Sequence, residues 1–356
     1  LFLQLASAHH LLVEPGVSSE WKIFNTSYAL YLAVLGSMIH GMSIPGAMEA
    51  AQRRNGFNNG VFEWLRKAPW GNPAFSGMFL SLVMFGFIGG ISGVMHASPT
   101  IDSQQQDTYF IVAHIHYVLF GGSMFGLFAG ITFWFPKMFG RMLNNSLGRV
   151  HFWITIIGFN IAFFPMHIIG IGGHMRRIYN PLQYDFLKDL EPINVTITLG
   201  ALMLGIGQII FALNIFGSLW KLNMNWYRKA AQVISSYLTA FVAYKFVTFY
   251  FEGLTKPTEP TMVGRTIAGI VAIVVFAWIY RYLSAKMGEL GETAPQNPWN
   301  ANTLEWVAPV IPPHGNFGPT LPEVHRGPYE YSVPGESDDW APQTKPLSDS
   351  AAAASH

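Results

Sequence analysis

The sequence contains no cysteine and few charged residues. None of its 356 residues is Cys, which excludes disulfides, thiolate metal sites and cysteine nucleophiles on this chain. Only 12% of the residues are charged, whereas soluble domains carry about 25%. The formal net charge of +1 gives no broad positive field, so nucleic acid is not expected as a partner. A metal ion on this chain must be held by His, Met, carboxylate or carbonyl groups.

Long apolar stretches dominate the rest of the sequence. Hydrophobic residues make up 51% of the chain and aromatic residues 15%. A membrane-spanning helix needs about 20 mostly apolar residues. Seven runs meet this requirement: Thr26–Met48, Phe75–His96, Phe110–Phe135, Val150–Gly172, Thr196–Leu219, Val233–Phe251 and Met262–Ala285. Leu1–Leu12 resembles the end of an eighth run, so we interpret the chain as the remainder of a longer protein. The expected fold class is an all-α polytopic transmembrane helix bundle.

The loops between these runs indicate an orientation. Loops rich in Lys and Arg alternate with poorer ones, and the rich set is expected to face the cytoplasm. This places the loop Ala97–Tyr109 on the outer side. The loop Gly173–Pro192 should also lie outside, yet it carries Arg176 and Arg177. An anionic group near the outer face would explain this exception, because guanidinium groups suit carboxylates and phosphates. The alternative is that the rule is only statistical.

The pair His114 and His116 lies within a predicted spanning helix. Polar residues at that depth are costly and usually functional. Residues two apart on an α-helix are separated by about 200°, so the two imidazoles should point to nearly opposite faces. They are therefore poorly placed to share one metal but well placed to bind two centres that flank the helix. The alternative is two histidines that bond to neighbouring helices.

The adjacent pair His9 and His10 follows the apolar stub at the start of the chain. Adjacent histidines can both reach one metal ion where a helix ends or is distorted. Taken alone, such a pair is more often a surface or interface feature.

Several motifs occur together in a fixed order. They are Ala8-His9-His10, the stretch Asp107–Tyr117, Trp134-Phe135-Pro136, the stretch Asn160–His167, Met175-Arg176-Arg177, the stretch Asn302–Trp306, and Pro312-Pro313-His314. In this order they resemble the catalytic subunit I of the haem–copper oxidase superfamily, in its carboxy-terminal part. The resemblance covers residues from about 5 to about 220 and resumes in the tail. It implies a membrane enzyme that reduces O2 to water and moves protons or charge across the membrane.

The resemblance implies roles for the four histidines. His9 and His10 would be two of the three ligands of the active-site copper, CuB. His114 would be the axial ligand of the high-spin haem that binds O2, and His116 an axial ligand of the low-spin haem. The high-spin haem is expected to be of the a type and the low-spin haem of the a or b type. Haem iron with one open axial position offers O2 a place to bind.

The resemblance also implies an outer polar region. Arg176, Arg177 and Asp102 would lie near the haem propionates. Asp107 would be a ligand for a non-redox Mg2+ or Mn2+ ion, although the family's usual His before this acid is Gln106 here. For Asp102 and Asp107 the alternative is a solvated loop.

The same resemblance predicts domains and partners. Residues 1–220 would form the oxidase core, 221–287 two additional transmembrane helices, and 288–356 an extended cytoplasmic tail. The third copper His and the second axial His of the low-spin haem would lie in a missing amino-terminal half of subunit I. Electrons would come from cytochrome c or a similar donor through a copper-bearing subunit II, with subunit III and other small subunits in the complex. The expected location is a bacterial inner (plasma) membrane.

Two other classes of protein remain as alternatives. A nitric-oxide reductase would share the histidine layout but carry non-haem iron in place of copper. A transporter or scaffold would hold no cofactor, and His114 and His116 would then be interhelical hydrogen-bond donors.

Overall fold

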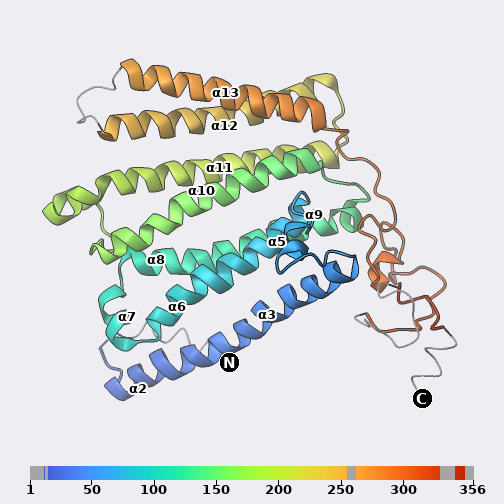
Figure 1. The fold of residues 1–356 in the computed structure, drawn as a ribbon, viewed down its shortest axis with the longest axis horizontal. Coiled ribbons are helices and arrows are strands. Elements are labelled where there is room, and N and C mark those ends of the chain that lie inside the picture. Colours follow the sequence, from blue (N-terminus) through green and yellow to red (C-terminus); the bar gives the residue numbers. More distant parts are fainter. Residues whose placement is uncertain (1–11, 13–14, 255–261, 329–340, 349–356) are drawn as a thin grey trace. The chain divides into compact units, whose positions relative to one another are not determined.

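The computed structural model describes residues 12, 15–254, 262–328 and 341–348. In chain order the elements are α2 (Ser19–Phe24), η2 (Asn25–Ala29), α3 (Leu30–Arg54), α4 (Glu63–Arg66), α5 (Pro73–Val83), η3 (Met84–Gly89), α6 (Gly90–His96), α7 (Pro99–Gln105), α8 (Tyr109–His116), η4 (Tyr117–Met124), α9 (Phe125–Phe139), α10 (Asn145–Ile171), η5 (Pro181–Gln183), η6 (Asp185–Leu190), α11 (Glu191–Leu219), α12 (Asn225–Leu254), α13 (Met262–Lys286) and η7 (Leu304–Trp306). Named strands are absent from these described residues, so the predicted all-α bundle is confirmed (Figure 1).

Six helical segments in the described part of the chain are long and apolar enough to cross a membrane. They are Pro73–His96, Tyr109–Phe139, Asn145–Ile171, Asp185–Leu219, Asn225–Phe251 and Met262–Lys286. Five of them contain a predicted apolar run in full, and Asn145–Ile171 contains all but the last residue of the run Val150–Gly172. The remaining run, Thr26–Met48, is helical in η2 and α3 but is not among the six, so its crossing stays a prediction.

Local sequence signals account for where the spans begin. The Asn72 side chain accepts hydrogen bonds from the backbone N–H groups of Ala74 and Phe75, and Pro73 occupies the first helical position of α5. At the start of α8 the Thr108 hydroxyl accepts from the N–H of Phe110 at 3.2 Å. These caps satisfy donors that a helix leaves unpaired at its start.

The chain divides into two compact units. The first contains Leu1–Gly130, Asn145–Leu213 and Lys229–Met287, and the second contains Ile131–Asn144, Asn214–Arg228 and Gly288–His356. The predicted division at residues 220 and 287 follows a different principle, the family pattern, and stays a prediction.

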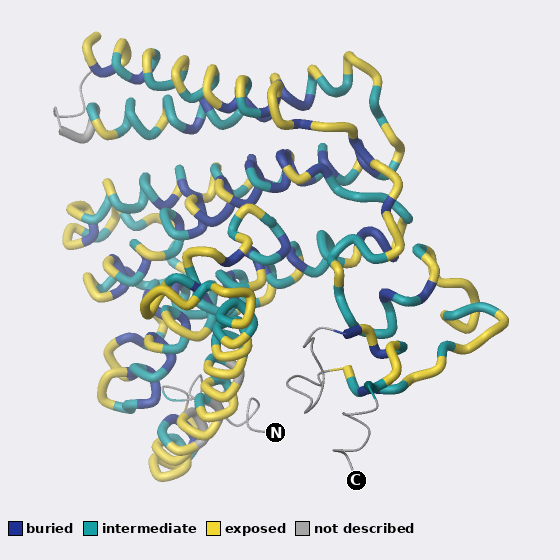
Figure 2. Tube along the Cα trace, turned by 45° about the vertical axis from the view of Figure 1, so that its right-hand side comes forward, coloured by how far each residue is buried: buried dark blue, intermediate teal, exposed yellow. Residues whose placement is uncertain are grey.

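The core of the first unit lies where the π-helical segments η3 and η4 pack on each other and on α10. Its buried residues are Met84, Tyr117, Phe125, Phe152, Ile156 and Phe159. A second cluster joins α8, α10 and α11 through Ala113, Met166, Ile169 and Ile197. Figure 2 shows long buried stretches in α10, whereas α3 is exposed along most of its length.

Helices α8 and α10 cross closely at Gly170. A Cβ atom built there would meet the backbone N of Phe110 at 2.1 Å, a distance that real contacts do not show. Glycine is therefore the residue that lets the two backbones approach, as small residues do in membrane bundles. This crossing fixes the start of α8 and hence the two histidines that follow.

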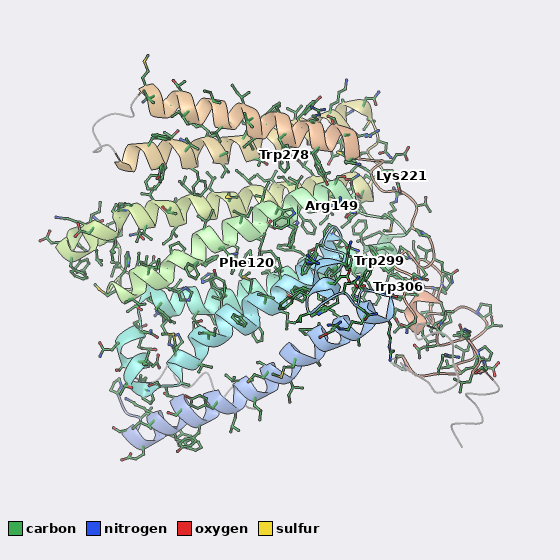
Figure 3. The ribbon with its side chains drawn as sticks, viewed as in Figure 1. Phe120, Arg149, Lys221, Trp278, Trp299 and Trp306 are labelled. Atoms are coloured by element: carbon green, nitrogen blue, oxygen red, sulfur yellow. The ribbon has the colours of Figure 1, made fainter. Side chains whose placement is uncertain are left out.

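In the second unit, the tail packs on the end of α9. Trp299 stacks on Phe133 with ring centroids 5.6 Å apart, and Trp306 stacks on Trp134 at 5.4 Å (Figure 3). The Lys137 ammonium, 8% exposed as a residue, donates to the carbonyls of Ala308 at 2.7 Å and Pro309 at 3.1 Å. A buried cation is stable here because its hydrogen bonds are made.

Candidate functional site

His114 lies against one face of η3 and α6. Its Nδ1 atom is 3.1 Å from the Gly89 carbonyl oxygen and 3.0 Å from the Ser92 hydroxyl. A Cβ built on Gly93 would come within 2.9 Å of His114 Cε1, so glycine leaves the space that the ring fills. Beyond Gly93, the His96 ring meets the His114 ring edge-on, with centroids 4.9 Å apart.

These contacts define the tautomer of His114. A carbonyl oxygen can only accept, and the Ser92 hydroxyl donates to the Ile88 carbonyl at 2.8 Å. Nδ1 therefore carries the proton, and in the neutral ring Nε2 carries the lone pair. Histidines that bind metals almost always donate their other N–H in this way, which fixes the ring orientation and raises its basicity.

Nδ1 of His116 also bonds a carbonyl oxygen, but its ring packs on a different helix. Its Nδ1 lies 2.7 Å from the Val112 carbonyl oxygen of its own helix, so this nitrogen also donates and Nε2 carries the lone pair. Its ring stacks on Phe163 of α10, with centroids 4.2 Å apart and planes 14° apart. Because Phe163 lies against the face of the imidazole, it does not block the Nε2 lone pair, which lies in the plane of the ring.

The two histidines thus contact different helices, as the helical spacing predicts. His114 faces η3 and α6, and His116 faces α10. In each ring Nδ1 faces a carbonyl oxygen, so Nε2 is the nitrogen that could bind haem iron, a role that histidine has in proteins. The arrangement can hold two separate centres, one on either side of α8.

Two loops near the start of α8 are joined to each other. Tyr109 N–H donates to the His174 carbonyl, Arg176 N–H donates to the Asp107 carbonyl at 2.9 Å, and the Arg176 guanidinium lies 2.9 Å from the Asp107 carboxylate. Asp107 and Arg177 adopt φ values of +60° and +64°. A non-glycine residue in this region is strained, and such strain often marks functional loops.

The predicted Mg2+ or Mn2+ ligand, Asp107, is half-exposed and paired with Arg176. Groups of three or more His, Asp or Glu that could hold a metal ion are absent from the residues the structure describes. One carboxylate paired with arginine is a weak donor set for Mg2+, which needs octahedral oxygen ligation. The metal assignment of Asp107 stays a prediction. Arg177 is exposed beside Arg176, where both could meet anions.

Asp102 has a partner that the sequence did not indicate. Its carboxylate lies 3.4 Å from Nδ1 of His96, and both side chains are fully buried. A solvated position, the alternative reading of Asp102, is therefore wrong. The predicted copper ligands His9 and His10 lie outside the described residues.

Known proteins share this combination of sequence and fold. The family described as "Cytochrome C and Quinol oxidase polypeptide I" matches residues 1–203, more than half of the chain. The chain belongs to this family. It is therefore a member of the haem–copper oxidase subunit I family and an integral membrane protein.

Relatives within the family are named either cytochrome c oxidases or quinol oxidases. Cytochrome c oxidase subunit 1 of Synechocystis is 36% identical over 72% of this chain and 34% of its own length. Alternative cytochrome c oxidase subunit 1 of Bradyrhizobium diazoefficiens is 31% identical over 74% of the chain and 34% of its own length. Quinol oxidase subunit 1 of Bacillus subtilis is 43% identical over 44% of the chain and 24% of its own length. The chain thus spans about a third or less of the length of these curated relatives.

A solved heme-copper terminal oxidase dimer has the same fold. The match has a TM-score of 0.57 at 17% identity and covers 79% of this chain and 55% of that one. At this identity the likeness concerns the fold alone.

One set of site residues was missed at the sequence level. Gly89, Ser92, Gly93 and His96 recur at i, i+3, i+4 and i+7, which places them on one helical face. Within an apolar span this stripe of small and polar residues was the available signal. It forms the surface on which His114 rests.

Proposed function

We propose that this chain is part of the catalytic subunit of a terminal oxidase that reduces O2 to water and moves charge across the membrane. The observation that carries the proposal is the placement of His114 and His116, which lie on opposite sides of α8. In each ring Nδ1 bonds a carbonyl group. Family membership supports it.

The residues present fit haem iron. His114 would be the axial ligand of a high-spin haem, and His116 one axial ligand of a low-spin haem. Nδ1 of His114 bonds the Gly89 carbonyl, and Gly93 leaves space for the ring. The bonded Nδ1 fixes the ring orientation and so directs Nε2 towards the iron. When bound, the high-spin haem with CuB would supply the site for the four-electron reduction of O2 to two waters. His9 and His10 are proposed as CuB ligands on sequence grounds.

The residues around these ligands have supporting roles in the proposal. Arg176 and Arg177 would hold haem propionates, since guanidinium groups bind carboxylates in a fork. The Asp107 ion pair would orient Arg176 before any haem is present. Asp102 would lie at the same outer end, in the propionate region, where its carboxylate is close to His96.

Cytochrome c is the proposed electron source, through a copper-bearing subunit II. The two relatives that match more than 70% of the chain are named cytochrome c oxidases, whereas the quinol oxidase matches 44%. The proposed location is a bacterial plasma membrane, with subunit III and the amino-terminal part of subunit I in the same complex.

A spectrum of the purified complex tests the function. Reduced-minus-oxidised absorption, CO binding, haem extraction and copper and iron analysis would be made on one sample. We expect two haems, of which one binds CO, with copper in stoichiometric amount. Two haems with extra non-haem iron and no copper would indicate a nitric-oxide reductase, and a colourless complex would exclude the oxidase.

A further inference from the structure

The His96–Asp102 pair is buried, and His96 has no role in the proposed function. His96 is the last residue of α6, and Asp102 lies on the following short helix α7. Neither side chain is exposed, and their Nδ1 and Oδ1 atoms are 3.4 Å apart. Burying a carboxylate is costly, and the contact with His96 offsets part of that cost.

The contacts of the His96 ring indicate a role for this residue. Its ring meets His114 edge-on at 4.9 Å and Phe110 edge-on at 5.5 Å, with interplanar angles of 73° and 89°. Phe110 is itself buried, 3% exposed, at the start of α8. The His96 ring is thus wedged between two residues of α8 and has little room to turn.

The His96 ring adds to the contacts that η3 and α6 make with His114. The Gly89 carbonyl and the Ser92 hydroxyl fix the Nδ1 edge of the ring, and Gly93 faces Cε1. These groups stop the ring from sliding along α6. The His96 ring adds a wall one turn further on, which opposes rotation of the imidazole about its Cβ–Cγ bond.

We infer that His96, held in place by Asp102, is a positioning residue for His114. It sets the angle at which the His114 imidazole is presented, and thereby the strength of the bond from Nε2 to a bound iron. This inference rests on the proposed function, because it assigns His114 to the high-spin haem. Supporting partners of ligand histidines commonly act in this way.

The experiment measures the iron–histidine bond directly. Variants His96→Ala, His96→Phe and Asp102→Asn would be made in the complete oxidase complex. Resonance Raman spectra of the reduced enzyme report the iron–histidine stretching band of a five-coordinate haem. The low-spin haem, bound at His116 on the other side of α8, does not give this band and serves as an internal measure of folding through its absorption.

A matched control is His151→Phe. His151 is also buried, 5% exposed, but it packs on Phe128 and Phe211 instead of His114. We expect His96→Ala to shift or broaden the band. His96→Phe, which refills the wall, should restore a narrow band, and Asp102→Asn should give an intermediate change. His151→Phe should leave the band as in the wild type.

The outcomes separate the two proposals. An unchanged band in His96→Ala, with the low-spin haem intact, would overturn the positioning role. An equal change in His96→Ala and His151→Phe would also overturn it, since the effect would then be general loosening. Absence of any five-coordinate haem band in the wild-type complex would instead contradict the proposed function.

Discussion

His114 and His116 are separated by a single residue, yet their surroundings share no side chain among those described above. His114 is bonded and walled by residues of η3 and α6, whereas His116 bonds within its own helix and stacks on α10. Two centres served by such independent surroundings should be lost independently.

The first prediction separates the two haems. His116→Ala should remove the low-spin haem and leave a haem that binds CO, whereas His114→Ala should remove CO binding and keep the low-spin band. Each variant should therefore retain about one of the two haems expected of this class. Haem extraction and CO difference spectra would measure this, and loss of both haems from each single variant would argue against independent sites.

The second prediction concerns the space beside His114. Gly93→Ala introduces a Cβ at 2.9 Å from His114 Cε1, so the ring must move. Overpacking of this kind costs about 1–3 kcal/mol. We expect a lower content of the CO-binding haem.

Gly269→Ala on α13 is the control for this substitution, because a Cβ there meets nothing within 4 Å. If both variants contained as much CO-binding haem as the wild type, the close fit of the His114 ring would be refuted.

At the residue scale, the sequence predicted the directions of side chains better than it predicted which residues they contact. The opposite directions of His114 and His116 follow from helical geometry alone. The pairing of Asp102 with His96 does not, because it depends on how the turn between α6 and α7 folds back. A carboxylate in a loop-like segment gives no local sign of whether it is solvated or buried.

At the element scale, six of the seven predicted apolar runs coincide with helices long and apolar enough to span a membrane, because length and hydropathy are local properties. The π-helical segments were not predicted. Segments η3 and η4 contain the sequences Met84–Gly89 and Tyr117–Met124, which an α-helix could also adopt. Their wider turns arise where the two segments pack on each other, and π turns are frequent at functional sites.

The third prediction tests the crossing of α8 and α10. Gly170→Ala would place a Cβ against the Phe110 backbone, so one helix must shift and the start of α8 would move with it. We expect a loss of at least about 1–3 kcal/mol. Thermal unfolding of the detergent-solubilised complex would show a lower midpoint.

Gly205→Ala on α11 is the comparison for that variant, since its Cβ would meet nothing within 4 Å. It should leave the midpoint unchanged or slightly raised, because alanine favours a helix interior over glycine. Equal midpoints for the two variants would mean that α8 and α10 do not cross closely at Gly170.

At the scale of the whole molecule, the tail was predicted to be extended, and regular structure in its described residues is limited to the short turn η7. Nevertheless Trp306 and Leu290 are buried, 2% and 0% exposed. The aromatic pairs that hold the tail join residues more than 160 positions apart, as the Trp299 indole bond to the Phe133 carbonyl does. Such pairing cannot be found from local composition.

The fourth prediction follows from Lys137. Lys137→Met would leave the carbonyls of Ala308 and Pro309 without their buried donor, at a cost of about 1–3 kcal/mol for each unsatisfied group. We expect the tail to be cut faster by chymotrypsin in the purified complex. Lys286→Met, at an exposed lysine, should match the wild type. Equal cleavage of both variants would show that the ammonium does not hold the tail.

The bond between Lys137 and Ala308 also dictates an order of events during biosynthesis. A further 171 residues must be made after Lys137 before its acceptor exists. Until the tail has been made, the Lys137 ammonium cannot form these bonds. The second unit is completed only after the spanning helix Met262–Lys286 has been made, because its largest segment follows that helix in the chain.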